Sequence, residues 1–154
     1  MPEILFYHLE RRTLEDVLPS LLEKTRKRGW KASVRVGSAE RMEVLDNHLW
    51  TFSEQSFLAH GTSADGYSAR QPIFLTTEKD DPNDADVLFL VDGEVVDKWD
   101  EDSLNKFERI VFLFDGGEGD ALNNARSAWK RAKEIGHEVT YWKESADGRW
   151  EKQE

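Results

Sequence analysis

The stretch RIVFLFDGG (residues 109–117) decides the fold, because an apolar run rich in β-branched and aromatic residues ends there at a pair of glycines. A short apolar run bounded by turn residues is typical of a buried strand. Residues 120–135 follow with alanines at helical spacing, and residues 137–145 again favour a strand. A strand, a helix and a strand in this order predict parallel pairing with a crossover helix, the unit of an α/β fold.

The same alternation extends back to the N-terminus. A helix is predicted from the capping residue Thr13 to Gly29, with Pro19 inside it, and a second helix after Ser38. Further strands are predicted over residues 3–9, 30–37, 56–60, 72–77 and 86–93, a short helix over 103–107, a polar loop over 61–71 and a tail over 146–154. The chain is therefore expected to be one α/β domain, residues 1–154, with a largely parallel sheet and helices on both faces.

The composition excludes several classes of protein. The chain has 154 residues, 38% of them hydrophobic, no cysteine and a formal net charge of −10. It offers no thiolate chemistry, and no apolar run approaches the roughly 18 residues that a membrane helix needs. The first residues, MPEILFYHL, lack the basic start of a signal peptide, so the cytoplasm is the expected compartment. An acidic protein repels phosphate over most of its surface, which disfavours nucleic acid as the main ligand.

The glycine-rich turn after residues 109–115 is the place where Rossmann-like folds hold phosphate. It lacks a third glycine in register and the Gly-Lys-Ser/Thr sequence of a phosphate loop. Its carboxylates, Asp115, Glu118 and Asp120, also oppose a phosphate. The four histidines show no metal-ligand spacing, and no nucleophile elbow is present. We therefore expect no catalytic residue, no metal and no cofactor.

One surface of the helix 120–135 departs from the acidic character of the chain. At about 100° per residue, a stripe of small residues falls on one side of the helix and is expected to face the sheet. Leu122 and Trp129 fall on the edge of this stripe, and Arg126, Lys130 and Lys133 lie just beyond it. Cations beside an indole suit an acidic peptide with an apolar end, whereas a solvated helix face with a half-buried tryptophan gives the same pattern. The stripe itself consists of Ala121, Ala125, Ala128, Ala132 and Ile135.

Several stretches resemble the chi subunit of bacterial DNA polymerase III, in the form typical of alphaproteobacteria. They are FYHL, LPSLLEKTRKRGWKASVR, LDNHLWTFSEQSFLAHG, QPIFLT, ADVLFLVDG, FERIVFLFDG and ARSAWKRAKEIGHEVTYWKESADGRW. These stretches cover nearly the whole chain in order, and LDNHLWTFSEQSFLAHG together with GHEVTYW is specific to this family. The sequence departs from the family at Ala59, where many members have proline, and at Leu122, where the enterobacterial type has lysine.

The resemblance implies a Rossmann-like three-layer sandwich and a non-catalytic accessory subunit of the DNA polymerase III holoenzyme. The chi subunit of the family binds the psi subunit of the clamp-loader complex. On another surface it binds the acidic C-terminal tail of the single-stranded-DNA-binding protein (SSB). Single-stranded DNA is then reached only indirectly, through SSB, and no membrane is involved.

The resemblance also implies which residues bind the tail. By motif match, the tail-binding arginine falls on Arg126 and the helix aromatic on Trp129, while the pocket aromatics fall on Trp50 and Phe57. The two aromatics are expected to wall a pocket that the helix 120–135 closes. The full set of expected tail-binding residues is Arg126, Trp129, Lys130, Lys133, Trp50 and Phe57.

Two other functions stay open from the sequence. A small Rossmann-like nucleotide-binding enzyme would use the DGGEGD turn, which its carboxylates oppose. A direct single-stranded-DNA-binding module would stack bases on tryptophan and tyrosine, but would need a basic track along the strand. For a psi contact, residues 86–93 and 94–99 are candidates, because Trp99 would be an exposed aromatic beside charges.

Overall fold

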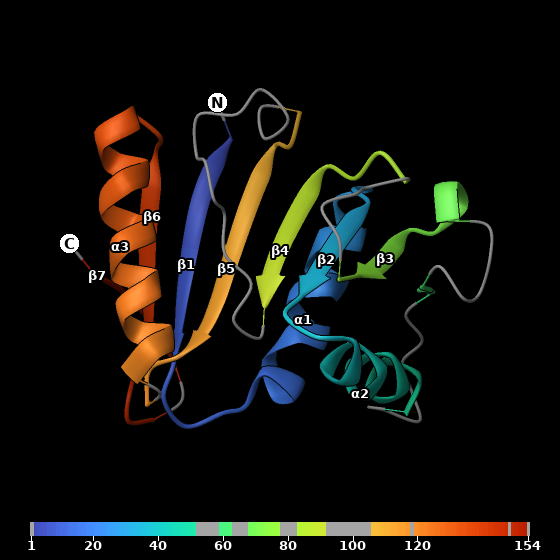
Figure 1. The fold of residues 1–154 in the computed structure, drawn as a ribbon, viewed down its shortest axis with the longest axis horizontal. Coiled ribbons are helices and arrows are strands. Elements are labelled where there is room, and N and C mark those ends of the chain that lie inside the picture. Colours follow the sequence, from blue (N-terminus) through green and yellow to red (C-terminus); the bar gives the residue numbers. More distant parts are fainter. Residues whose placement is uncertain are drawn as a thin grey trace.

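A computed structural model describes residues 2–51, 59–62, 68–77, 83–91, 106–117, 119–147 and 149–153. These residues form one sheet with the strand order β3-β2-β4-β5-β1-β6-β7 (Figure 1). All neighbouring strands pair in parallel except β6 and β7. The predicted α/β class with a largely parallel sheet is therefore confirmed. The strands are β1 (Glu3–Leu9), β2 (Ala32–Val36), β3 (Ile73–Thr76), β4 (Val87–Val91), β5 (Arg109–Asp115), β6 (Val139–Glu144) and β7 (Trp150–Gln153).

The strand β5 lies between β4 and β1, at the centre of the sheet. Its Val111 pairs with Leu5 on one side and with Phe89 on the other. The residues between the two ends of β5 are buried. Because helices cover both faces, the strand is apolar at consecutive positions instead of alternating, and this pattern made it predictable.

Three α-helices pack against the sheet in the part of the chain that the structure describes. They are α1 (Leu14–Lys27), α2 (Ala39–Thr51) and α3 (Gly119–Ile135), and a short 3₁₀ helix, η2 (Ser68–Arg70), precedes β3. The helices α1 and α2 share one apolar core with the sheet, and α3 shares a second core with the opposite face. Figure 1 shows α3 over the end of the sheet formed by β1 and β6, and α2 near β2 and β3 at the other end.

Local signals place the first helix where the sequence predicts it. The Thr13 hydroxyl accepts a hydrogen bond from the Asp16 backbone N–H at 3.3 Å, and the Asp16 carboxylate accepts one from the Thr13 backbone N–H at 3.0 Å. This reciprocal cap satisfies two N–H groups that the helix leaves unpaired, and the bond from the Thr13 backbone holds the pKa of Asp16 below its usual value. At the other end, Gly29 adopts a φ of 78°, which glycine tolerates and most residues do not.

The prediction of an irregular tail over residues 146–154 is wrong, because Trp150–Gln153 form the antiparallel edge strand β7. The Trp150 ring packs edge-on against Tyr7, with 5.0 Å between ring centroids. The guanidinium of Arg12 lies 5.4 Å from the Trp150 centroid. The remaining residues of β7 are exposed and charged or polar, as is common on edge strands, so no apolar alternation marked them as a strand.

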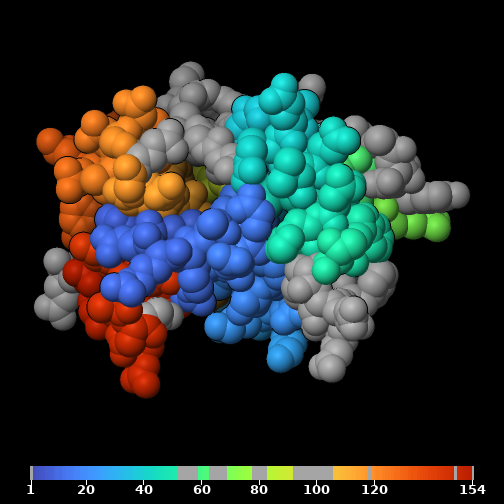
Figure 2. Space-filling model, turned by 90° about the horizontal axis from the view of Figure 1, so that it is seen from below, coloured from blue at the N-terminus to red at the C-terminus, as the bar shows by residue number. Residues whose placement is uncertain are grey.

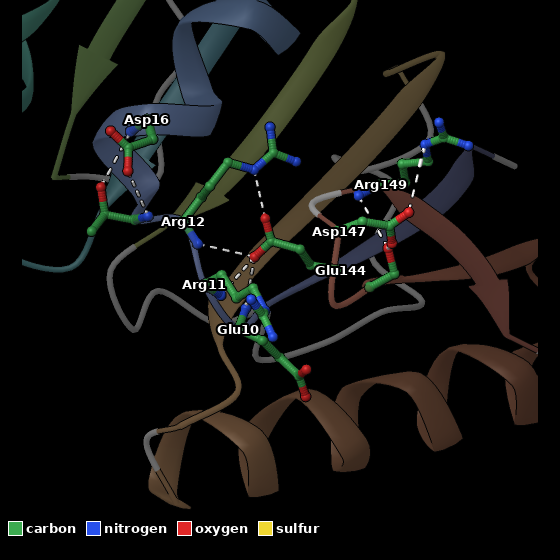
Figure 3. A network of polar contacts seen from close by, with 9 residues as sticks. Glu10, Arg11, Arg12, Asp16, Glu144, Asp147 and Arg149 are labelled. Atoms are coloured by element: carbon green, nitrogen blue, oxygen red, sulfur yellow. Dashed lines mark hydrogen bonds and ion pairs between the residues drawn. The ribbon is translucent and has the colours of Figure 1, made fainter.

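A buried carboxylate joins the end of β6 to the loop between β1 and α1. The Glu144 carboxylate accepts hydrogen bonds from the backbone N–H groups of Glu10 (3.2 Å), Arg11 (2.7 Å) and Arg12 (3.0 Å) (Figure 3). Its other oxygen pairs with Nε of Arg12 at 2.5 Å. Burial alone would raise the pKa of Glu144, but these donors overcome it and lower that pKa to about 2. Figure 2 shows the resulting contact between the C-terminal residues (red) and the N-terminal segment (blue).

Three predicted elements fall partly outside the described residues. The strand over 56–60 is described only at 59–60, which are not in a strand, and the helix over 103–107 only at 106–107, which are not helical. The loop predicted over 61–71 is described only at its two ends. It begins with a buried glycine that pairs with the sheet: Gly61 forms a bridge with Phe74, and its carbonyl accepts a hydrogen bond from the Leu75 N–H at 2.9 Å.

Candidate protein-interaction site

The helix α3 buries its small residues and exposes its charges. Ala125, Ala128 and Ala132 are buried against the sheet. Leu122 and Trp129 are partly buried at the margin of the same core. The predicted sheet-facing stripe and its edge are confirmed, and they follow from helical periodicity alone.

A group of cations lies beside this margin. Arg126, Lys130 and Lys133 are all exposed, and Nζ of Lys133 lies 4.2 Å from the ring centroid of Trp129. This distance is that of a cation–π contact, which holds the ammonium group over the indole. Within the described residues, no carboxylate pairs with Arg126 or Lys130. We call Leu122, Arg126, Trp129, Lys130 and Lys133 the α3 cation edge.

Arg126 of the α3 cation edge lies near β1 and β6, where β6 is the strand next to the edge strand β7. Burial raises the pKa of Tyr141, and the charge of Arg126 is close enough to oppose this rise. Burial also lowers the pKa of His8, and the charges of Lys143 and Arg126 lower it further while Glu10 opposes them. The Tyr141 hydroxyl and Nδ1 of His8 are 2.7 Å apart, and Nζ of Lys143 lies 3.3 Å from the Glu10 carboxylate. The strand β6 therefore adds an aromatic ring, Tyr141, within reach of the Arg126 charge, whereas Lys143 is ion-paired with Glu10.

Trp50 does not lie at this edge. It belongs to α2, which packs against β2 and β3, whereas α3 packs against β5, β1 and β6 on the opposite face of the sheet (Figure 1). Its side chain is 46% exposed, and its ring centroid lies 4.1 Å from that of His60. The expectation that Trp50 and the helix 120–135 enclose one pocket is therefore wrong, and Phe57 lies outside the described residues.

The acidic turn between β5 and α3 is closed on itself. The Asp115 side chain accepts a hydrogen bond from the Gly117 N–H at 2.8 Å, as an Asx turn does. A Cβ at Gly116 would lie 1.8 Å from Nε2 of His8, so the backbone passes against this ring and only glycine fits. Of the three carboxylates predicted to oppose a phosphate here, Asp115, Glu118 and Asp120, Glu118 lies outside the described residues. The turn thus uses its own N–H and carboxylate internally, which disfavours phosphate binding.

The described residues offer neither a metal site nor a membrane-spanning helix. No group of three or more histidine, cysteine, aspartate or glutamate side chains is placed to hold a metal ion. No helix in the described part of the chain combines the length and the apolar character that crossing a membrane requires.

A family model described as DNA polymerase III chi subunit, HolC, matches residues 1–140. The chain belongs to the DNA polymerase III chi subunit family. The chain is also 28% identical, over 117 residues, to a protein named "Probable DNA polymerase III subunit chi" from Rickettsia prowazekii (strain Madrid E), an alignment that covers 75% of this chain and 71% of the relative. The resemblance drawn from sequence stretches alone, including its alphaproteobacterial type, is confirmed.

The chi family match places α3 within the shared region, but it ends at residue 140, before Tyr141 and Lys143. Neither of these residues was predicted as part of the site. They share the α3 face of the sheet, because Tyr141 pairs with Phe6 and Lys143 pairs with His8. Because alternate residues of a strand share a face, the sequence could have grouped Tyr141 with Lys143. It does not say which face of that strand the preceding helix covers.

Proposed function

We propose that this chain is a non-catalytic accessory subunit of the DNA polymerase III holoenzyme that binds the acidic C-terminal tail of SSB. Membership of the chi family supports the place in the polymerase. In this role the chain associates with the clamp loader, through a psi subunit where one is present, and links the replicase to SSB-coated template. The tail contact is assigned to the α3 cation edge.

The observation that carries the tail contact is the set of exposed cations around a half-buried indole. Tail carboxylates meet Arg126, with Lys130 or Lys133 in support, and the apolar end of the tail packs against Leu122 and Trp129. Charge-assisted bonds to carboxylates are about twice as strong as neutral ones, and arginine can make two in parallel. A formal net charge of −10 makes this cation group a local exception, which favours a short acidic segment over long polynucleotides.

The test is a salt titration of the affinity for a synthetic SSB-tail peptide, measured for wild type and three variants. Losing a charged hydrogen bond costs about 1.5–3 kcal/mol, so Arg126→Ala is expected to bind about tenfold to hundredfold more weakly. Its affinity should also depend less on salt, because one ion pair is gone. Trp129→Ala should bind more weakly with nearly the wild-type salt dependence, because it removes apolar contact instead of charge.

The matched control is Arg131→Ala, on the same helix. Arg131 is exposed and pairs with Glu134 at 3.6 Å. At roughly 100° per residue it points to a different side of α3 from Arg126. The Arg131→Ala variant should bind the tail peptide with wild-type affinity. Thermal melts check that all three variants fold. Wild-type affinity in a folded Arg126→Ala protein would place the tail site elsewhere.

A further inference from the structure

A second cationic surface lies on the face of the sheet opposite α3. A cavity of about 380 Å³ opens between the end of α1 and the strands β1, β4 and β5. Its floor is a row of apolar side chains in register across the three strands, because Leu5 pairs with Val111 and Val111 pairs with Phe89. Leu21 of α1 completes the apolar lining. We call this cavity the α1 pocket.

The mouth of the α1 pocket is positively charged. Lys24, Lys27 and Arg28, from the last turn and cap of α1, line it together with Arg109 at the start of β5. None of the described lining residues carries a carboxylate. Cations are expected at the end of a helix, where the dipole amounts to about half a negative charge. Three cations exceed that charge, so the mouth stays positive.

Arg109 supplies an independent sign of a missing partner. Its Nη2 lies 3.4 Å from the Glu3 carboxylate, but its Nε is buried and has no hydrogen-bond partner among the described residues. A buried charged donor without an acceptor is costly, and structures normally satisfy such groups. An anionic ligand on the rim of the α1 pocket would meet the part of the Arg109 side chain that stays exposed, 25% of it.

Trp30 decides between a peptide and a nucleobase. The guanidinium of Arg28 lies 5.0 Å from the Trp30 ring centroid, and that of Arg109 lies 5.5 Å from it. Arg26 fixes the same residue by donating a hydrogen bond to its backbone carbonyl at 2.9 Å. A base stacking on this indole would have to compete with these guanidinium groups. An apolar side chain can pack on the floor without displacing either guanidinium group from Trp30. The volume of the pocket exceeds the roughly 300 Å³ at which ligand pockets begin, so it can hold part of a short peptide segment.

We propose that the α1 pocket binds an acidic peptide segment of a partner protein, with one apolar side chain on the floor and carboxylates on the rim cations. The cations of the mouth and the apolar floor both match such a segment. Since α3 and α1 cover opposite faces of the sheet, this site is separate from the α3 cation edge. It does not depend on the proposed binding of the SSB tail.

The test is an NMR titration of the full chain with an acetylated and amidated hexapeptide of five acidic residues and one leucine. The Nε resonance of Arg109 and the indole resonance of Trp30 are expected to shift in a saturable way. The double variant Lys24→Glu/Arg28→Glu reverses two exposed rim charges. It should lower the affinity for the peptide, fitted from these shifts, at least tenfold. Arg126→Ala should leave them unchanged, which separates this site from the α3 cation edge.

Two further ligands sharpen the test. A peptide with serine in place of leucine should bind more weakly, because it leaves the floor uncovered, and a hexameric oligothymidylate should bind more weakly than the leucine peptide. Equal binding of the serine peptide or of the oligothymidylate would overturn the proposal. Absence of shifts at Arg109 and Trp30 at about 1 mM peptide, or shifts that survive the charge reversal in a folded variant, would also overturn it.

Discussion

The buried carboxylate of Glu144 should make the stability of the protein depend on pH in a defined window. The pKa of Glu144 is about 2 in the folded chain against an ordinary value of 4.5. One pKa unit corresponds to about 1.4 kcal/mol, so the ionised group contributes roughly 3 kcal/mol to the free energy of unfolding at neutral pH. Because the folded pKa is depressed, this contribution is complete above the unfolded value and is lost as pH falls from about 5 toward 2. Roughly 2 kcal/mol of it should be gone by pH 3.

The substitution Glu144→Gln removes the charge while keeping one acceptor oxygen for the loop N–H groups. We expect urea unfolding to show a loss of about 2–3 kcal/mol relative to wild type at pH 7, and a difference that shrinks steadily toward pH 3. The matched control is Glu151→Gln on the exposed edge strand β7, which should track wild type throughout. An equal loss at pH 7 and pH 3 would refute the electrostatic reasoning and reduce Glu144 to a packing residue.

Three other results are expected. Gly116→Ala should lower the free energy of unfolding by about 1–3 kcal/mol in thermal or urea unfolding, because its Cβ would meet the His8 ring. Gly119→Ala, whose Cβ would have no heavy atom within 4 Å, should be close to neutral. A larger loss for Gly119→Ala than for Gly116→Ala would contradict this packing. Thr13→Ala should cost about 1 kcal/mol of unfolding free energy through loss of the α1 cap, and an unchanged urea midpoint would show that the cap contributes nothing. The purified chain should not hydrolyse nucleotides, and metal-dependent turnover abolished by Asp115→Asn would contradict the reading of its turn as structural.

The sequence predicted the elements whose pattern reflects their burial. The run 109–115 and the alanine stripe of α3 are apolar at the positions that the fold covers, so the strand β5 and the orientation of α3 followed from local rules. The edge strand β7 escaped prediction because its partner is only β6 and its residues after Trp150 face solvent. An edge strand of this kind carries no periodic signal.

For the candidate site, local patterns grouped residues of one helix but not residues from different elements. Helical spacing was enough to group Trp129 with the α3 cations, since these residues share one helix. Grouping Trp50 with them failed, because its place depends on the order β3-β2-β4-β5-β1, which puts α2 and α3 at opposite ends of the sheet. The α1 pocket was missed for a related reason: its floor combines Leu5, Phe89 and Val111, which only the strand register brings together.

Whether the chain meets the template through the SSB tail is tested by measuring the binding of the wild-type chain to three targets at physiological salt. The targets are single-stranded DNA coated with SSB, the same DNA coated with SSB that lacks its acidic tail, and naked DNA, all measured by surface binding. The chain should bind clearly to the first target and little or not at all to the other two, because the tail supplies the carboxylates and the net charge repels the DNA. Equal binding to the tail-less coat, or to naked DNA, would contradict the claim that this chain meets the template through the SSB tail.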